Sequence, residues 1–176
     1  MTTGDSRVFV PKEFPRYETI LEAAHRYPAV DPSAVKTFLT FLRVASDVQT
    51  ALQAHYSRIH ISQGRFVVLM LLNFNSDSEM GPCDLAEKLG VTRATITGLL
   101  DGLERDGFIK RLDNPEDRRR MTVILTPAGR RYLDRVLPDH FRRTAALMGA
   151  LSVKERGELT RLLTKVAAGI PAVRNP

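Results

Sequence analysis

The chain has 176 residues, an apolar fraction of 43% and a formal net charge of +6. This length is sufficient for one hydrophobic core, and the positive charge is compatible with a nucleic-acid partner without requiring one. One cysteine excludes an internal disulfide and fits a reducing cytoplasm, while the sequence shows no signal peptide and no apolar run long enough to span a membrane.

Residues 1–30 are interpreted as an N-terminal extension. Several prolines interrupt them, and only the segment Tyr17–Tyr27 can hold a helix. Two roles remain open for the extension. It is either an arm that packs on an oligomer, or an arm that contacts DNA or covers a ligand pocket.

A long helix is predicted from Asp31 to Arg58. Asp31 and Pro32 form an N-cap and first-turn pair. Residues of a mostly apolar stripe then recur at alternating steps of three and four: Val35, Phe38, Leu42, Ala45, Gln49 and Leu52. Such a stripe needs a partner along its whole length, so residues 31–60 are predicted to be a dimerisation helix.

A buried helix is predicted next, because Ser62 can cap a segment whose run Phe66–Leu72 is apolar on nearly every side. A polar loop is expected from Asn73 to Gly81. Two shorter helices should follow, separated by a tight turn at Gly90, where a left-handed residue is needed. Thr92 is the expected N-cap of the second of them.

The second short helix has one apolar face, formed by Ile96, Leu99, Leu100 and Leu103, and Gly107 ends it. Two β-rich runs, Phe108–Leu112 and Met121–Leu125, are predicted to pair as a hairpin. The loop between them contains Arg118, Arg119 and Arg120. Basic residues outnumber acidic ones from Lys110 to Arg131; this run is interpreted as part of a binding surface rather than as an ordinary solvated face.

The C-terminal region is predicted to be helical. Thr126 and Pro127 begin one helix, and Pro138 is expected to kink or break it. Ser152 and Glu155 form a capping box for a last helix. Its apolar stripe, like that of the first long helix, lacks a partner, so residues 127–176 are predicted to be C-terminal dimerisation helices.

Helix, tight turn, helix and hairpin is the element order of a winged helix-turn-helix, which residues 61–126 are predicted to form. The fold class is therefore mainly α with a small β-hairpin wing and a helical dimerisation region. A second helix with one buried face can enter the major groove of double-stranded DNA, where its N-terminal residues approach the base edges. The expected contacts are Thr92, Arg93, Thr95 and Thr97, with the arginine loop reaching phosphates or the minor groove.

This region resembles the MarR family of bacterial transcription regulators. The wing signature D-x-R-x-x-x-(L/V)-x-L-T-x-x-G is matched by Asp117, Arg119, Val123, Leu125, Thr126 and Gly129. Four further segments also fit: Asp84-Leu85-Ala86, Thr92–Thr97, Leu103-Glu104 and Gly107-Phe108-Ile109. The similarity extends over roughly residues 33–170. This sequence differs from common family members at Gly98 and Gly102. Both are expected to be exposed helix positions without a side chain to contact bases.

The resemblance implies a homodimer that binds pseudo-palindromic DNA, often as a repressor released by a small ligand or by oxidation. It also implies that Asp117 stiffens the wing and that Arg119 enters the minor groove. Because Arg118 and Arg120 point away from Arg119 in an extended segment, they are expected to lie along phosphates or to pack on the wing.

A small-molecule pocket is also implied, between the dimer helices and the winged helix. The candidate residues are Tyr56, His60 and Arg65, because an imidazole and a guanidinium suit an aromatic or anionic ligand. The alternative is that they make structural or solvated hydrogen bonds. Urate is disfavoured because the chain has no Trp.

No cofactor or metal site is expected, since the four histidines show no short ligand spacing. Cys83 is interpreted as structural, with a redox sensor as the alternative. The sequence therefore predicts a cytoplasmic, homodimeric repressor with a small-molecule effector and no membrane partner. The alternative is a winged-helix module for protein or nonspecific nucleic-acid contact; no catalytic motif supports an enzyme.

Overall fold

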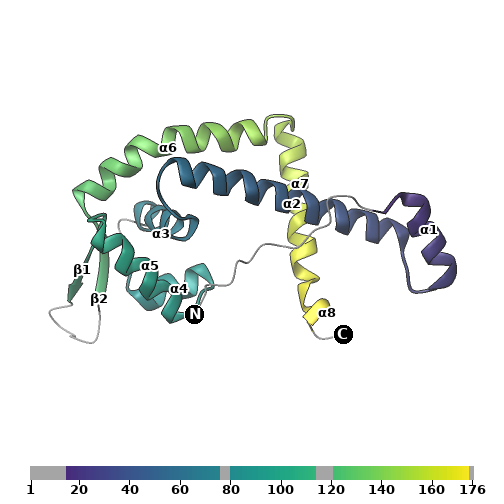
Figure 1. Ribbon diagram of the computed structural model, residues 1–176, viewed down its shortest axis with the longest axis horizontal. Helices are drawn as coiled ribbons and strands as arrows, with labels where there is room; N and C mark the ends of the chain where they lie inside the picture. Colours follow the sequence, from purple (N-terminus) through teal and green to yellow (C-terminus); the bar gives the residue numbers. More distant parts are fainter. Residues whose placement is uncertain (1–14, 76–79, 114–120, 175–176) are drawn as a thin grey trace. The chain divides into compact units, whose positions relative to one another are not determined.

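The computed structural model describes residues 15–75, 80–113 and 121–174. It confirms a mainly α-helical chain with one two-stranded antiparallel hairpin (Figure 1). The chain divides into two compact units, Met1–Val68 and Leu69–Pro176. Within the described residues, no helix is both long enough and apolar enough to cross a membrane.

The first unit contains α1 (Tyr17–Arg26) and α2 (Pro32–Arg58), both as predicted. A carboxylate oxygen of Asp31 accepts hydrogen bonds from the backbone N–H of Ser33 at 2.9 Å and of Ala34 at 3.1 Å. These bonds satisfy N-terminal donors that a helix cannot satisfy itself, which explains where α2 begins. Helix α1 packs against α2.

Helix α3 (Gln63–Phe74) crosses the boundary between the units. Ser62 accepts a hydrogen bond from the backbone N–H of Arg65 at 3.4 Å, as its predicted capping role requires. The helix runs beyond the predicted loop start at Asn73, because its apolar side continues to Leu72 and the side chain of Asn75 donates to the carbonyl of Leu71. Phe66, Val68, Leu69 and Leu72 are buried.

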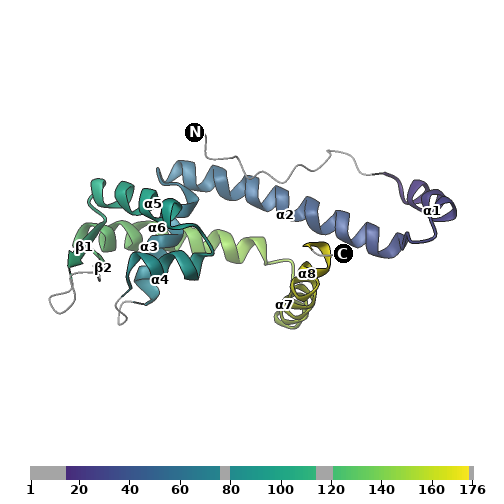
Figure 2. The same ribbon diagram turned by 90° about the horizontal axis from the view of Figure 1, so that it is seen from below.

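The second unit contains α4 (Pro82–Leu89) and α5 (Arg93–Arg105), which lie side by side in both ribbon views (Figures 1 and 2). Strands β1 (Ile109–Asp113) and β2 (Met121–Leu125) follow. Residues from all four elements are buried together in the core of this unit: Leu85, Ile96, Leu100, Leu103, Ile109 and Val123. The hydrophobic core therefore fixes the hairpin directly behind α5.

The two strands are antiparallel, with Ile109 opposite Leu125 and Asp113 opposite Met121. The backbone N–H of Val123 also donates to the carbonyl of Met80 at 2.9 Å, which attaches the chain before α4 to the hairpin. The arginine-containing loop lies outside the described residues, so the structure reports only the part of the wing nearest the core.

The C-terminal helices are α6 (Pro127–Leu147), α7 (Val153–Ala168) and α8 (Ile170–Arg174). The expected break at Pro138 is wrong, because α6 continues through it to Leu147. Proline there removes one backbone donor, but Tyr132, Leu133 and Val136 are buried in the preceding turns and hold the helix. The capping box of Ser152 and Glu155 forms as predicted.

Candidate nucleic-acid interface

The turn between α4 and α5 is built by two residues with different tasks. Gly90 adopts a left-handed conformation with φ of +62°, which costs glycine little. Thr92 then caps α5, and its hydroxyl accepts a hydrogen bond from the backbone N–H of Thr95 at 3.1 Å. Because both ends of the turn are fixed, the first residues of α5 have a defined position on the surface.

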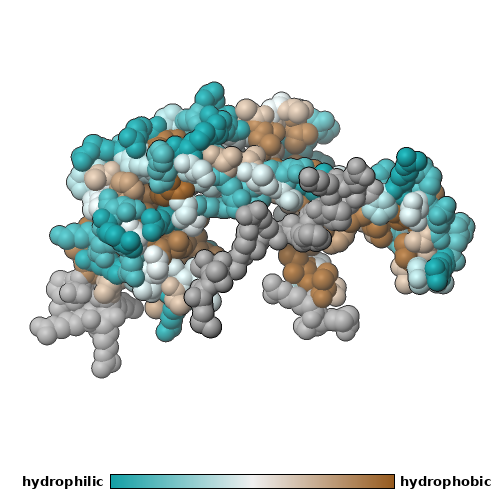
Figure 3. Space-filling model, in the orientation of Figure 1, coloured by the Kyte–Doolittle hydropathy of each residue, from teal (hydrophilic) through white to brown (hydrophobic). Residues whose placement is uncertain are grey.

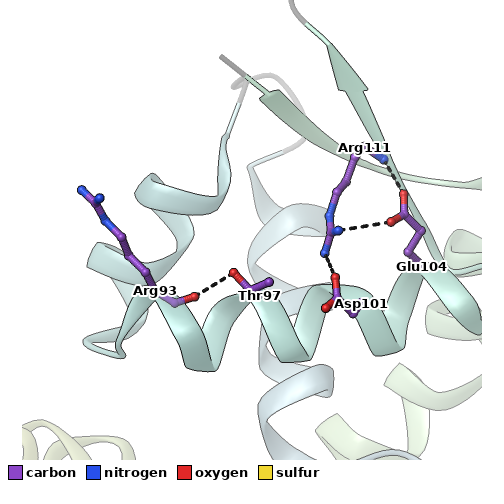
Figure 4. Close-up of polar contacts among 5 residues, drawn as sticks. All are labelled: Arg93, Thr97, Asp101, Glu104 and Arg111. Carbon is purple, nitrogen blue, oxygen red and sulfur yellow. Dashed lines mark hydrogen bonds and ion pairs between the residues drawn. The ribbon is translucent and has the colours of Figure 1, made fainter. Parts of the chain in front are cut away.

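The four residues predicted to contact bases are all exposed at this end of α5: Thr92, Arg93, Thr95 and Thr97. The side chain of Arg93 extends away from the helix (Figure 4). Thr97 donates its hydroxyl proton to the carbonyl of Arg93 at 2.8 Å, and the hydroxyls of Thr92 and Thr95 lie 2.9 Å apart. Arg93 therefore has the longest reach, while Thr97 offers an acceptor oxygen and a methyl group.

An ion-pair network that the sequence analysis missed links the second half of α5 to the hairpin. The guanidinium of Arg111 lies 2.6 Å from a carboxylate oxygen of Asp101 and 3.4 Å from one of Glu104 (Figure 4). The backbone N–H of Arg111 also donates to Glu104 at 3.1 Å. Its side chain is 22% exposed, so water screens these contacts only partly.

We call Arg111, Asp101 and Glu104 the hairpin clamp. The sequence analysis counted Arg111 only as one of the basic residues near the wing. The available signal was a pair of carboxylates three positions apart on a helix, followed by a cation on the next strand. That spacing alone does not give the angle at which a strand meets a helix, and the angle decides whether the charges meet.

The base of the hairpin is held by Thr126, which caps α6. Its hydroxyl lies 2.7 Å from the carbonyl oxygen of Gly107, to which it donates, and accepts from the N–H of Gly129 at 3.0 Å. A Cβ atom at Gly129 would overlap the carbonyl oxygen of Phe108. This contact gives a physical reason for the threonine and glycine of the T-x-x-G part of the signature.

The two glycines of α5 have different surroundings. Gly98 is exposed, and a Cβ there would meet no atom within 4 Å. Gly102 is buried, so the prediction that both are exposed is wrong for Gly102. It lies at the edge of the apolar stripe next to Leu103, where the absence of a side chain lets neighbouring groups cover the backbone.

The predicted wing residues Asp117, Arg118, Arg119 and Arg120 lie outside the described residues. The predicted ligand residues belong to the first unit, around the junction of α2 and α3. Tyr56 is buried and its ring packs on Phe66 with centroids 5.2 Å apart, whereas His60 is exposed and Arg65 is half-buried. Burial raises the pKa of the Tyr56 phenol.

Two further predictions concern Cys83 and metals. Cys83 is exposed in the first turn of α4 and does not belong to the hydrophobic core. Its structural role, with a redox sensor as the alternative, stays a prediction. In the ranges 15–75, 80–113 and 121–174, no group of three His, Cys, Asp or Glu residues is arranged to hold a metal ion.

The fold and this surface define a winged helix-turn-helix protein, and comparison with known proteins identifies its family. The MarR family model matches residues 61–121. The HTH-type transcriptional repressor YetL of Bacillus subtilis is 36% identical over 152 residues, which cover 86% of this chain and 91% of that protein. The transcriptional repressor MprA of Escherichia coli is 31% identical over 106 residues, 60% of each chain.

Solved structures agree on the fold. The MepR–DNA complex of Staphylococcus aureus superposes with a TM-score of 0.67 at 21% identity, covering 75% of this chain and 94% of that one. PcaV of Streptomyces coelicolor, solved with its natural ligand, gives 0.62 at 22% identity, covering 72% and 91%. The chain belongs to the MarR family. It is a DNA-binding transcription regulator and not an enzyme.

Proposed function

We propose that this protein is a repressor that binds a pseudo-palindromic operator as a homodimer and is released by a small ligand. The observation that carries the proposal is the exposed N-terminal end of α5, where Arg93 and three threonines surround a fixed turn. Repressor activity is supported by YetL and MprA, whose names describe them as repressors.

Recognition of the DNA base sequence is assigned to the first turns of α5. Arg93 is long enough to donate two hydrogen bonds to one guanine in the major groove. Thr92, Thr95 and Thr97 lie beside it and contribute shorter contacts to bases or phosphates. In the wing, Arg119 enters the minor groove, Asp117 orders it, and Arg118 and Arg120 lie along the phosphates or pack on the wing.

Dimerisation is assigned to the two terminal helical regions, residues 31–60 and 127–176, with residues 61–126 as the DNA-binding domain and 1–30 as an extension. Phe38 on α2 is 58% exposed, and α7 has no buried residue in a single chain. Figure 3 shows hydrophobic residues at the surface of α7 and α8. A second copy that covers these faces brings two copies of α5 about one DNA turn apart, roughly 34 Å.

The releasing ligand is assigned to the region of Tyr56, His60 and Arg65, in keeping with an aromatic or anionic effector. An imidazole and a guanidinium can both donate hydrogen bonds to a carboxylate, and the rings near Tyr56 offer apolar contact. The structure of PcaV with its natural ligand shows that a protein of this fold can hold a small molecule.

The test is fluorescence anisotropy with the region upstream of the protein's own gene and with shuffled DNA of equal length. We expect at least about a thousandfold preference for the native region, as for other specific regulators at physiological salt. Equal affinity for both DNAs contradicts the proposal and favours a winged helix used for nonspecific nucleic-acid or protein contact.

A further inference from the structure

One acidic side chain lies on the face of α5 that points away from the hydrophobic core. Asp101 is exposed, and at about 100° per residue its direction around the helix axis falls between those of Thr97 and Gly98. The buried residues Ile96 and Leu100 lie on the other side of the helix. Asp101 therefore belongs to the surface proposed to enter the major groove, where attraction to phosphates alone would favour basic residues.

The carboxylate of Asp101 is held in one orientation. One of its oxygens accepts a hydrogen bond from the guanidinium of Arg111 at 2.6 Å (Figure 4). In the part of the chain that the structure describes, its second oxygen has no hydrogen-bond or ion-pair partner, and the side chain is 51% exposed. An ionised carboxylate only accepts hydrogen bonds, so this second oxygen is available to a donor on DNA.

The hairpin clamp as a whole fixes the cation that holds Asp101. Glu104 accepts a hydrogen bond from the backbone N–H of Arg111 at 3.1 Å and lies 3.4 Å from its guanidinium. Asp101 therefore loses little side-chain freedom when it meets DNA. Two carboxylates and one guanidinium leave the clamp with one negative charge. This charge lowers the affinity for phosphates, so it is favourable only where a base supplies a donor to the carboxylate.

Small residues beside Asp101 allow its short side chain to reach the base edges. Ala94 and Gly98 are exposed on the same face of α5, and a Cβ atom at Gly98 would meet no protein atom within 4 Å. Long side chains at these two positions would hold the helix away from the floor of the major groove. With alanine and glycine there, the backbone of α5 can approach the bases closely, which a contact through aspartate requires.

Cytosine presents the base edge that best fits a fixed carboxylate. In the major groove cytosine offers an amino donor, whereas guanine offers two acceptors, and thymine offers one acceptor and a methyl group. Adenine offers an amino donor beside the acceptor N7, which a carboxylate cannot satisfy. The amide of asparagine differs, because it can accept from N6 of adenine and donate to N7 at the same time.

We propose that Asp101, positioned by Arg111, selects cytosine at one base pair of each operator half-site. This inference rests on the proposed function, because it requires α5 to recognise bases in the major groove. Asp101 is the residue that touches the base, whereas Arg111 is a positioning residue that acts through it. Arg93 lies about two helical turns earlier, so the guanine assigned to it belongs to a different base pair.

The experiment compares the base preferences of protein variants at every position of the DNA. The full chain selects binding sites from a randomised duplex, and fluorescence anisotropy then gives its affinity for the selected site and for every single-base-pair variant of that site. For the unmodified protein, we expect cytosine at one position of each half-site to be favoured by at least about fivefold. Asp101→Asn should change this preference to adenine, and Asp101→Ala should remove it.

Two further variants separate base selection from charge and from general positioning. Asp134→Asn removes the same charge from an exposed position on α6 and should keep the cytosine preference. Arg111→Lys keeps a positive charge but lacks the planar guanidinium, so it should reduce the cytosine preference and leave the guanine preference of Arg93 unchanged. Circular dichroism during thermal unfolding checks that each variant remains folded.

The outcomes that overturn this inference can be distinguished from failure of the proposed function. If Asp101→Asn strengthens binding to every DNA by the same factor, then Asp101 acts only as a surface charge. If the unmodified protein prefers one site but Asp101→Asn alters no base preference, then Asp101 contacts no base and the proposed function stands. If no sequence is preferred over shuffled DNA, then both fail. An equal loss of preference at all positions in Arg111→Lys overturns the role of Arg111.

Discussion

At the residue scale, base recognition depends on how many donors and acceptors of α5 remain available to DNA. Thr97 gives its hydroxyl proton to the carbonyl of Arg93, and the hydroxyl of Thr92 is engaged with Thr95. The threonines therefore contribute mainly acceptors and methyl groups. Arg93 is the long donor at this end of the helix, so discrimination between guanine and other bases should depend on it.

Arg93→Ala should cost about 1–3 kcal/mol of binding free energy on the native operator and relax the preference at one base pair. Anisotropy titrations with operators mutated one pair at a time measure this. Arg142→Ala removes the same charge from an exposed position on α6 and serves as the control. An equal loss on native and random DNA would make Arg93 a phosphate contact.

Substitutions in the wing should change DNA affinity in a direction that distinguishes an ordered wing from a basic patch. Arg119→Ala should weaken binding to all DNA and reduce the salt slope by about two per dimer, because one arginine in each wing no longer neutralises a phosphate. Asp117→Ala should also weaken binding, because a wing that is no longer held must be ordered when DNA binds. Both are measured at several salt concentrations; tighter binding by Asp117→Ala would indicate an unstructured basic patch.

At the element scale, the sequence predicted the helices and strands well because their ends are determined locally. The caps at Asp31, Thr92, Thr126 and Ser152 all form, and each depends on side-chain bonds within three residues. The hairpin clamp and the burial of Gly102 could not be predicted, because they depend on how a strand and a helix approach each other. The continuation of α6 through Pro138 depends on packing too, because the buried residues Tyr132, Leu133 and Val136 hold the preceding turns.

The hairpin clamp should contribute both to stability and to DNA binding. Arg111→Gln leaves the carboxylates of Asp101 and Glu104 without their cation, which should cost about 1–2 kcal/mol of unfolding free energy. It should weaken DNA binding as well, because the carboxylate of Asp101 lies exposed on α5 and, without its cation, repels the DNA phosphates. Denaturant unfolding gives the first quantity and anisotropy the second.

A double-mutant cycle separates the pair from its surroundings. If Arg111 acts through Asp101, then Arg111→Gln should cost less in the presence of Asp101→Asn than alone. Additive effects of the two substitutions would show that the clamp does not couple them.

Two glycines provide a matched pair of stability predictions. Gly129→Ala should destabilise the fold by about 1–3 kcal/mol, because the new methyl group overlaps the carbonyl of Phe108. Gly98→Ala should stabilise it by about 0.5–1 kcal/mol, because the position is helical, exposed and open. Denaturant unfolding at one fixed protein concentration measures both, and a shift of the same sign in the two variants would contradict this interpretation.

At the scale of the whole molecule, the exposed apolar faces of α2 and α7 indicate an assembly larger than one chain. Leu162 on α7 is 45% exposed, and Leu163 beside it is 40% exposed. Faces of this kind are unusual on a protein that acts alone. The sequence predicted them from unpartnered stripes, but it contained no information on the angle between the helices or the geometry of a two-fold axis.

Leu162→Glu should dissociate the dimer and reduce operator binding sharply, because each protomer then binds only one half-site. Sedimentation velocity at micromolar concentration measures the assembly. Thr164→Glu places the same charge on roughly the opposite side of α7 and should remain dimeric. A stable monomer in the unmodified protein would contradict the assignment.

The open space at Gly98 has a consequence for how such regulators diverge. A new side chain at this position meets no obstacle and removes a helix-weakening glycine, so it can extend toward DNA while it strengthens α5. After a gene duplication, one copy can therefore acquire a different operator in a single substitution without first losing folding stability. Gly98 is therefore a position at which α5 can gain a new base contact.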